Sequence, residues 1–310
     1  MADQPAGSHH PPQPELVPAP APEADDENDH NDSALGSVDS LRSSTASLTS
    51  SILNYRTFHG RTYHSDRYNV DYFTPNDEQQ LESINISYYY LSIILDNRLY
   101  LAPIKKDIQK AVDIGTGTGI WAIWPNNTFD FVHMRYLFGA IIGWDLPYQQ
   151  AYRCCKPEGW FESCEIDPLI YSDDGTTNGV YAVERWNELF REAGKKTGRS
   201  FAPVEDNLQA NAIKDAGFVH REQANYKVPL GPWAADKKLK EIGQFAQFAM
   251  DNDLDGYTMH IWHNVLNWPK EEYPVFLMSV REYLKNRSIH GYMSVRIVYG
   301  RKPKDEVSAT

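Results

Sequence analysis

The stretch Lys110-Ala-Val-Asp-Ile-Gly-Thr-Gly-Thr-Gly-Ile120 decides the fold of this chain of 310 residues. Its first part, residues 111–114, is a short apolar run that predicts a buried strand. Three glycines follow at alternate positions, namely Gly115, Gly117 and Gly119. Glycine accepts positive φ angles and allows a ligand to lie directly against the backbone. The pattern therefore predicts a strand that ends in a tight, ligand-binding turn.

A carboxylate stands near the end of this predicted strand. Asp113 lies where open α/β sheets hold their ligands, at the carboxyl end of a strand. The glycine spacing is G-x-G-x-G and position 120 is Ile, so the dinucleotide-binding pattern G-x-G-x-x-G fails. A purely structural tight turn is the alternative, and the flanking sequence has to decide between the two.

Predicted strands and helices alternate around this turn. Further strands are expected at 128–135, 160–166, 218–228 and 293–299, and helices at 48–56, 77–98, 144–155, 176–197, 205–216, 234–250 and 270–286. This alternation predicts an α/β fold with a doubly wound, mostly parallel sheet whose last two strands pair antiparallel. The helix at 77–98 has one apolar stripe, expected to face the core, made of Leu81, Ile84, Tyr88, Leu91 and Leu95.

Composition divides the chain into three parts. Residues 1–45 are rich in Pro, Ser and acids and have almost no large apolar side chains, so we expect a disordered tail. Residues 46–303 are expected to form the folded domain, and residues 304–310 a C-terminal tail. Of the formal charge of −12, nine acids and one base in residues 1–50 account for −8. The remainder is mildly acidic without a basic stripe, so direct nucleic-acid binding is not expected.

The three cysteines, Cys154, Cys155 and Cys164, show no ligand-like spacing. We expect reduced, half-buried thiols in a cytoplasmic or nuclear protein, and no metal site. The first residues lack the basic and apolar regions of a secretory signal, and no apolar run reaches about 18 residues. We therefore expect no signal peptide and no membrane span.

Several short motifs follow one another in a recognisable order. They are Asn54-Tyr-Arg56, Gly60-Arg-Thr-Tyr-His64, Pro75-Asn-Asp-Glu78, Leu101-Ala-Pro103, the segments 113–123 and 129–135, Gly159-Trp160, Ala216-Gly-Phe218 and Tyr299-Gly-Arg-Lys-Pro303. As a set, over roughly residues 50–303, they resemble the fungal methyltransferase-domain proteins related to LaeA, the regulator of secondary metabolism. The resemblance implies a Rossmann-like class I methyltransferase sheet that binds S-adenosylmethionine (SAM) inside a fungal cell. It implies cofactor contacts at Asp113, Gly115, Thr116, Gly117 and Gly119.

This sequence departs from the family pattern after the glycine turn. Only nine residues, 120–128, separate Gly119 from Phe129, where the family has a helix, an acid-ended second strand, another helix and a third strand. We expect the second and third strands to be absent and residues 111–114 to form an exposed edge, followed by a short helix at 120–123. The alternative is that residues 141–145, which end at Asp145, form the acid-ended second strand.

Loss of these strands affects the expected cofactor site. An acid about 20 residues beyond the glycine turn usually holds the ribose hydroxyls. Gly139 stands at that distance, and a glycine cannot do this. A smaller departure is Pro157-Glu158-Gly159, where the family has Pro-Gly-Gly. We therefore expect contacts to the methionine end of SAM to remain and those to ribose and adenine to be lost.

The candidate catalytic residues lie at the end of the strand at 128–135. His133 is either a general base or a hydrogen-bonded core histidine. Arg135 either binds an acceptor carboxylate or forms an ion pair with Glu162 or Glu165, and the ion pair is favoured. Tyr63 either closes over the cofactor or packs in the core. A cluster of His260, Trp262 and His263 is expected to pack between helices.

Three functions remain open at this point. The chain is a SAM-dependent methyltransferase of unknown acceptor, or a catalytically inactive relative that acts through a protein partner in a regulatory complex. The third possibility is the product of a transcript that lacks an exon between Ile123 and Trp124. Methyl transfer from a sulfonium needs alignment and desolvation but no metal.

Overall fold

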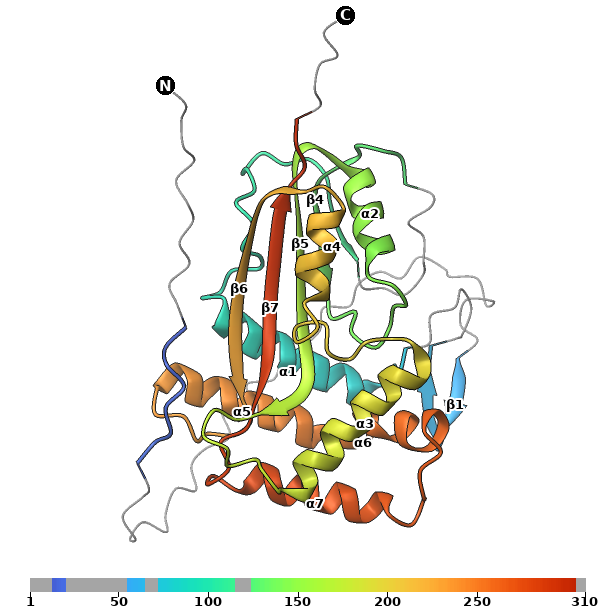
Figure 1. The fold of residues 1–310 in the computed structure, drawn as a ribbon, viewed down its shortest axis with the longest axis vertical. Helices are drawn as coiled ribbons and strands as arrows, with labels where there is room; N and C mark the ends of the chain where they lie inside the picture. Colours follow the sequence, from blue (N-terminus) through green and yellow to red (C-terminus); the bar gives the residue numbers. More distant parts are fainter. Residues whose placement is uncertain (1–12, 21–54, 65–71, 115–123, 305–310) are drawn as a thin grey trace, which may run out of the picture.

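The sheet of this protein contains five strands in the order β3-β4-β5-β7-β6 (Figure 1). The computed structural model describes residues 13–20, 55–64, 72–114 and 124–304. The strands are β3 (Ala111–Ile114), β4 (Phe129–Arg135), β5 (Cys155–Tyr171), β6 (Val219–Pro229) and β7 (Tyr292–Arg301). β3, β4 and β5 are parallel, whereas β7 is antiparallel to both β5 and β6. The predicted α/β sheet with an antiparallel closing pair is confirmed.

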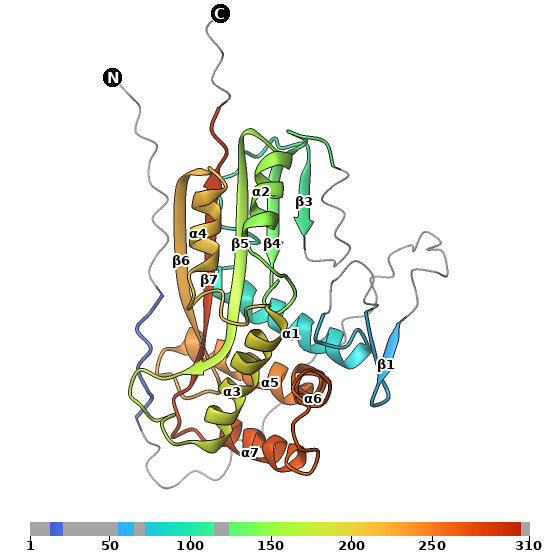
Figure 2. The same cartoon turned by 45° about the vertical axis from the view of Figure 1, so that its right-hand side comes forward.

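This strand order is that of a class I methyltransferase sheet without its second and third strands. Within the described residues, β3 pairs with β4 alone and forms one edge of the sheet, as Figure 2 shows. The predicted helix at 120–123 lies outside the described residues. The alternative second strand at 141–145 is wrong, because Asp145 begins a helix.

Helices cover both faces of the sheet and extend beyond one end of it (Figure 1). They are α1 (Glu78–Ile94), α2 (Asp145–Cys154), α3 (Tyr181–Thr197), α4 (Leu208–Asp215), α5 (Lys237–Asn252), α6 (Leu254–His260), the π-helix η3 (Ile261–Val265) and α7 (Tyr273–Lys285). α2 and α4 cover the face that carries Val132, Met134 and Phe161. α1 passes behind the sheet and packs along α5. The result is a three-layer arrangement with one apolar core on each side of the sheet.

The chain from Tyr55 to His64 differs from the sequence prediction. Tyr55 has no regular secondary structure, and Arg56 begins a hairpin of β1 (Arg56–Phe58) and β2 (Arg61–Tyr63), so neither is helical; residues 48–54 lie outside the described residues. His59 and Gly60 both have positive φ, at 49° and 77°, which fits the two-residue turns that join twisted strands. A His-Gly pair between short strands was the signal for this hairpin.

Arg61 anchors the hairpin to two helix starts. Its guanidinium pairs with Asp77, which caps α1 by accepting from Gln80 N at 3.1 Å, and with Asp253. Asp253 in turn accepts from Gly256 N in the first turn of α6 at 3.1 Å. One arginine thus fixes the directions of α1 and α6 relative to the hairpin.

The apolar stripe predicted for α1 is only half correct. Leu91 and Leu95 are buried, but Leu81 and Tyr88 are 53% and 45% exposed. The face of α1 that enters the core carries Gln80 and Ser83 together with Tyr90, Leu91 and Ile94. The helix is therefore rotated relative to the predicted stripe, and polar side chains enter the interior.

β5 is much longer than the strand predicted at 160–166, because it begins before the turn residues Pro157-Glu158-Gly159 and continues to Tyr171. The register to β4 shifts between Phe129 and Phe131, which places a bulge here. A Cβ on Gly159 would lie 2.9 Å from the Asp130 carbonyl oxygen, so only glycine fits there. Glu158 has φ +62° and is exposed. This acidic residue holds a backbone conformation that suits glycine.

Residues 13–20 differ from the tail that was expected to be disordered throughout residues 1–45. They form an extended segment beside β6, in which Ala19 N donates to Trp233 O at 2.8 Å and Ala235 N donates to Val17 O at 2.8 Å. The Gln13 side chain exchanges two hydrogen bonds with the backbone of Lys227 in β6. The rest of the tail lies outside the described residues.

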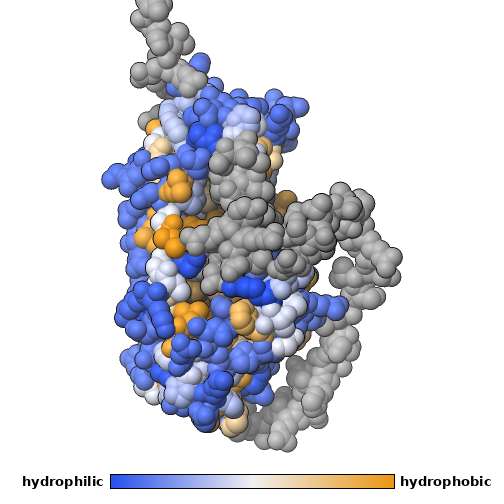
Figure 3. Space-filling view, turned by 90° about the vertical axis from the view of Figure 1, so that its right-hand side faces the viewer, coloured by the Kyte–Doolittle hydropathy of each residue, from blue (hydrophilic) through white to orange (hydrophobic). Residues whose placement is uncertain are grey.

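The surface carries only scattered hydrophobic groups in the view of Figure 3, which looks onto the side of the molecule next to β3. In the described part of the chain, no helix is both long and apolar enough to cross a bilayer.

The left-handed backbone of Glu158 yields a stability prediction. A residue with a Cβ in this conformation costs about 1 kcal/mol relative to glycine. Glu158→Gly should unfold at a higher urea concentration than Glu158→Ala, with a difference of about 1 kcal/mol in the free energy of unfolding. The two variants lose the same carboxylate, so equal stabilities would contradict the proposed strain.

Candidate active site

One polar row crosses the whole sheet. The strand register places Asp113 of β3 opposite His133 of β4, and His133 opposite Glu162 of β5. Glu162 is in turn opposite Tyr299 of β7, and Tyr299 is opposite Glu222 of β6. Directly opposed residues in a sheet point to the same face. The pairing of the strands alone therefore brings the predicted residues Asp113 and His133 together.

Asp113 and His133 form a hydrogen-bonded pair at the carboxyl end of β3. His133 Nδ1 lies 2.9 Å from Asp113 Oδ1. The Asp113 side chain is 73% exposed, whereas that of His133 is 8% exposed. The hydrogen bond from His133 lowers the pKa of Asp113 below its ordinary value. Asp113 is thus an ionised, oriented carboxylate that faces outward.

Glu162 closes the other side of His133. Its Oε2 accepts from Leu101 N at 2.8 Å and from Ala102 N at 2.6 Å. Its Oε1 lies 3.7 Å from His133 Nε2, a distance beyond a direct hydrogen bond. Burial raises the pKa of Glu162. His133 is therefore enclosed between two carboxylates, and this geometry suits a residue that positions Asp113; its predicted role as a general base stays a prediction.

Arg135 does not form the ion pair favoured from the sequence. Its guanidinium lies over the Tyr88 ring, 5.2 Å from the ring centroid, and its Nη2 lies 3.4 Å from Leu99 O. Glu162 and Glu165 are instead engaged by backbone N–H groups. The charge of Arg135 is thus not neutralised by either predicted partner, and it remains a candidate to bind an acceptor.

Of the other predicted site residues, Tyr63 lies in the described part of the chain and the glycine-turn residues do not. Tyr63 is fully buried in the hairpin, and its ring packs against Phe58 and His260 at centroid distances of 5.5 and 5.4 Å. These contacts correspond to the packing alternative for Tyr63. Trp262 stacks on Phe276 in the helical layer. The predicted cofactor residues Gly115, Thr116, Gly117 and Gly119 lie outside the described residues.

Buried carboxylates on β5 are the feature that the sequence prediction missed. Glu165 accepts from Leu137 N and Phe138 N, which follow β4, at 2.9 and 3.1 Å. Asp167 accepts from Val204 N and Glu205 N, both at 2.8 Å. Together with Glu162, each acid holds a loop by two backbone donors. Half of this signal was present in the sequence, because acids inside a buried strand need partners, but the sequence does not show that backbone groups supply them.

The sequence is similar to curated fungal methyltransferases. The methyltransferase pytC of Aspergillus terreus is 30% identical, and the match covers 84% of this chain and 92% of that protein. The chain belongs to the LaeA-like fungal methyltransferases. The probable methyltransferase tdiE of Emericella nidulans is 28% identical over 74% of this chain and 84% of that protein. The protein-methionine methyltransferase laeA of the same species is 25% identical over 79% and 75%.

Comparison with solved structures gives weaker similarities. A phosphoethanolamine N-methyltransferase of Haemonchus contortus matches with 16% identity and a TM-score of 0.32, over 58% of this chain and 35% of that one. The cyclopropane synthase MmaA2 of Mycobacterium tuberculosis matches with 15% identity and a TM-score of 0.28, over 59% and 58%. No model of a protein family matches the sequence. The fold assignment of this LaeA-like chain therefore rests on its own strand order.

The β5 carboxylates make stability depend on pH. Burial raises the pKa of Glu165 from 4.5 to about 8 and that of Asp167 from 3.8 to about 7. Both groups bind their protons more tightly in the folded than in the unfolded chain, so stability is greatest below the unfolded pKa. It should then fall as pH rises toward the two folded values.

Thermal unfolding at about pH 5.5 and about pH 8.5 measures this dependence. The wild type should lose several degrees of melting temperature between the two conditions. Glu165→Gln, which cannot ionise, should lose less, whereas the exposed control Glu282→Gln should follow the wild type. An equal loss in the wild type and Glu165→Gln would show that Glu165 does not titrate in this range.

Proposed function

We propose that this LaeA-like chain is a SAM-dependent methyltransferase that holds its cofactor weakly at the carboxyl ends of β3 and β4. The observation that carries the proposal is the outward-facing carboxylate of Asp113, which His133 fixes at a strand end. This is the place where open α/β sheets bind ligands. Ionised and exposed, Asp113 can accept hydrogen bonds from the methionine end of the cofactor.

The described residues fit one half of the cofactor. Asp113 supplies an acceptor for an ammonium or hydroxyl group at the end of β3. On the other side of β3, where a second strand would offer an acid to the ribose, the described residues supply no strand. We therefore propose low affinity, since each missing hydrogen bond to a ligand costs about 0.5–1.5 kcal/mol.

The reaction needs the acceptor in line with the methyl group. When bound, SAM would supply a methyl group on a sulfonium. The acceptor's lone pair would form the new bond to carbon, and the electrons of the carbon–sulfur bond would return to sulfur. The acceptor's proton would leave to a base or to water. In this chain, His133 would hold Asp113 in place. Arg135 lies at the end of β4 and forms no ion pair with Glu162 or Glu165, so it would orient the acceptor. Alignment of this kind supplies much of the catalysis without a metal.

A second candidate follows from the position of β3. A sheet edge with unpaired backbone groups is a site for pairing with another chain. If SAM does not bind, the chain is a catalytically inactive relative, and this edge is where a protein partner in a regulatory complex would attach.

We place the protein in the cytoplasm or nucleus. All three cysteines, Cys154, Cys155 and Cys164, are buried and free, as expected in a reducing compartment.

Isothermal titration with SAM tests the proposed function. We expect saturable binding that Asp113→Asn weakens by about tenfold, because the variant removes a charge-assisted hydrogen bond. The matched control Asp107→Asn changes an exposed acid in the loop before β3 and should bind as the wild type does. If millimolar SAM gives no heat of binding and no shift of the melting temperature, the enzyme is rejected and the inactive relative is favoured.

A further inference from the structure

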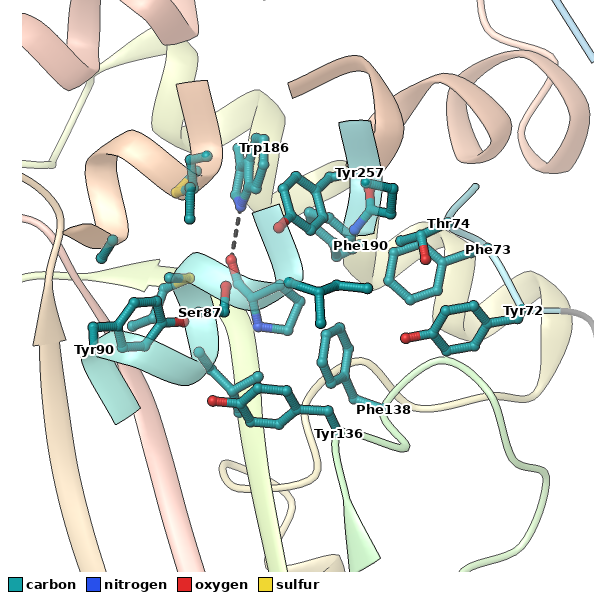
Figure 4. Close-up of a pocket in the computed structure, with 18 residues that line it drawn as sticks. Tyr72, Phe73, Thr74, Ser87, Tyr90, Tyr136, Phe138, Trp186, Phe190 and Tyr257 are labelled. Atoms are coloured by element: carbon teal, nitrogen blue, oxygen red, sulfur yellow. Dashed lines mark hydrogen bonds between the residues drawn. The ribbon is translucent and has the colours of Figure 1, made fainter. Parts of the chain in front are cut away.

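An apolar pocket lies next to the end of β4, between α1, α3 and α5 (Figure 4). Two of its wall residues, Tyr136 and Phe138, follow directly after Arg135 of β4. Glu165 fixes this wall by accepting from the Phe138 backbone at 3.1 Å. The pocket wall therefore continues from the strand end at which the proposed function places Arg135.

The wall of the pocket is aromatic and uncharged. Eight of its lining side chains are aromatic, and none is an acid, a base or a histidine. Burial raises the pKa values of Tyr72, Tyr90, Tyr136 and Tyr257, so these phenols keep their protons at neutral pH. An ionised ligand would have no opposite charge to pair with in this wall, which makes its burial costly.

Polar atoms inside the pocket lack partners. Thr74 Oγ1 and Gln80 Oε1 are buried and have no hydrogen-bond partner of ordinary length in the described part of the chain; Thr74 has the Tyr72 hydroxyl as its neighbour, and Gln80 Oε1 lies against Gly256 of α6. The two residues are 2% and 1% exposed, so solvent does not satisfy these atoms. Figure 4 shows Thr74 beside Phe73 and Tyr257 at the cavity, with the hydroxyl of Tyr72 also directed to its interior. The Ser87 hydroxyl at the same wall donates to Ser83 O at 3.0 Å. Buried polar groups normally find a partner, so these atoms indicate a ligand with a hydroxyl or carbonyl group.

The size of the cavity sets the size of the ligand. Its volume is about 90 Å³. An apolar cavity of about 150 Å³ in another protein accepts benzene. The volume here is smaller, so a single ring with a small polar substituent is the largest ligand that the pocket can admit, and it enters only if flexible wall side chains such as Met250 and Met293 move aside.

We infer that this pocket binds a neutral, single-ring aromatic compound with a hydroxyl group, a simple phenol. Its assignment as the methyl acceptor rests on the proposed function; its assignment as a binding site rests on the pocket alone. The ring would lie among Phe73, Phe138 and Trp186, and its hydroxyl would reach Thr74. This names a substrate class that neither the relatives nor the strand order supply.

Binding of phenol and of benzoate to the full chain tests the inference. Both ligands have one ring, but at neutral pH phenol is neutral and benzoate is charged. Trp186 lines the pocket and is one of eight tryptophans, so the difference in fluorescence between the wild type and Trp186→Phe reports occupancy. We expect phenol to bind saturably, to change the fluorescence and to raise the melting temperature, and benzoate to bind at least tenfold more weakly. No saturable binding, or equal binding of both, would overturn the inference.

Two variants locate the binding site. Thr74→Val keeps the shape but removes the hydroxyl, and should weaken phenol binding about five- to tenfold while the free protein is as stable as the wild type or more so. Ala249→Leu fills the cavity and should abolish phenol binding without lowering the melting temperature. If Thr74→Val binds phenol as tightly as the wild type, the hydroxyl contact is wrong, whatever Ala249→Leu does.

Failure of the pocket inference and failure of the proposed function give different results in these experiments. Phenol binding is measured without SAM, and the SAM titration is measured without phenol. Phenol binding in a chain that does not bind SAM would support the pocket and reject the enzyme. SAM binding without phenol binding would reject the pocket ligand and leave the enzyme.

Discussion

The parallel pairing of β3 with β4 positions the whole candidate site. Because residue 113 lies opposite residue 133, the pairing brings a carboxylate and an imidazole within 2.9 Å at the end of two strands. Glu162 continues the same row on β5 and holds the loop at Leu101 and Ala102. β3 has no strand on its other side within the described residues. In the proposed function, the same pairing would present Asp113 to the cofactor, and the described residues supply no strand on the ribose side.

Buried acids on β5 connect this row to the pocket. Glu162, Glu165 and Asp167 each accept two backbone N–H groups from a different loop. Burial raises the pKa of each, whereas the backbone donors lower it, and burial is the larger effect. One strand therefore fixes three loops, and the loop held by Glu165 supplies Phe138 to the wall of the aromatic pocket.

The sequence predicted what depends on periodicity and chain order, including all five strands, the antiparallel closing pair and helices α1 to α5 and α7. It also predicted that Asp113 and His133 each lie near the carboxyl end of a strand. It failed where tertiary contacts decide. Tyr88 belongs to the apolar stripe of α1 but is 45% exposed, because the core takes Gln80 and Ser83 instead. Arg135 was assigned to the acids of β5, but no sequence pattern shows that backbone donors occupy them.

Amide hydrogen exchange along β3, resolved to single residues, measures the central claim most directly. In a strand paired on one side only, alternate amides point away from the partner and lack a hydrogen bond. We predict slow exchange for alternate amides of residues 111–114 and fast exchange for those between them, beside uniformly slow exchange in the central strand β5. Slow exchange at every amide of β3 would show a second strand beside it, and would contradict a cofactor site that lacks a strand on the ribose side.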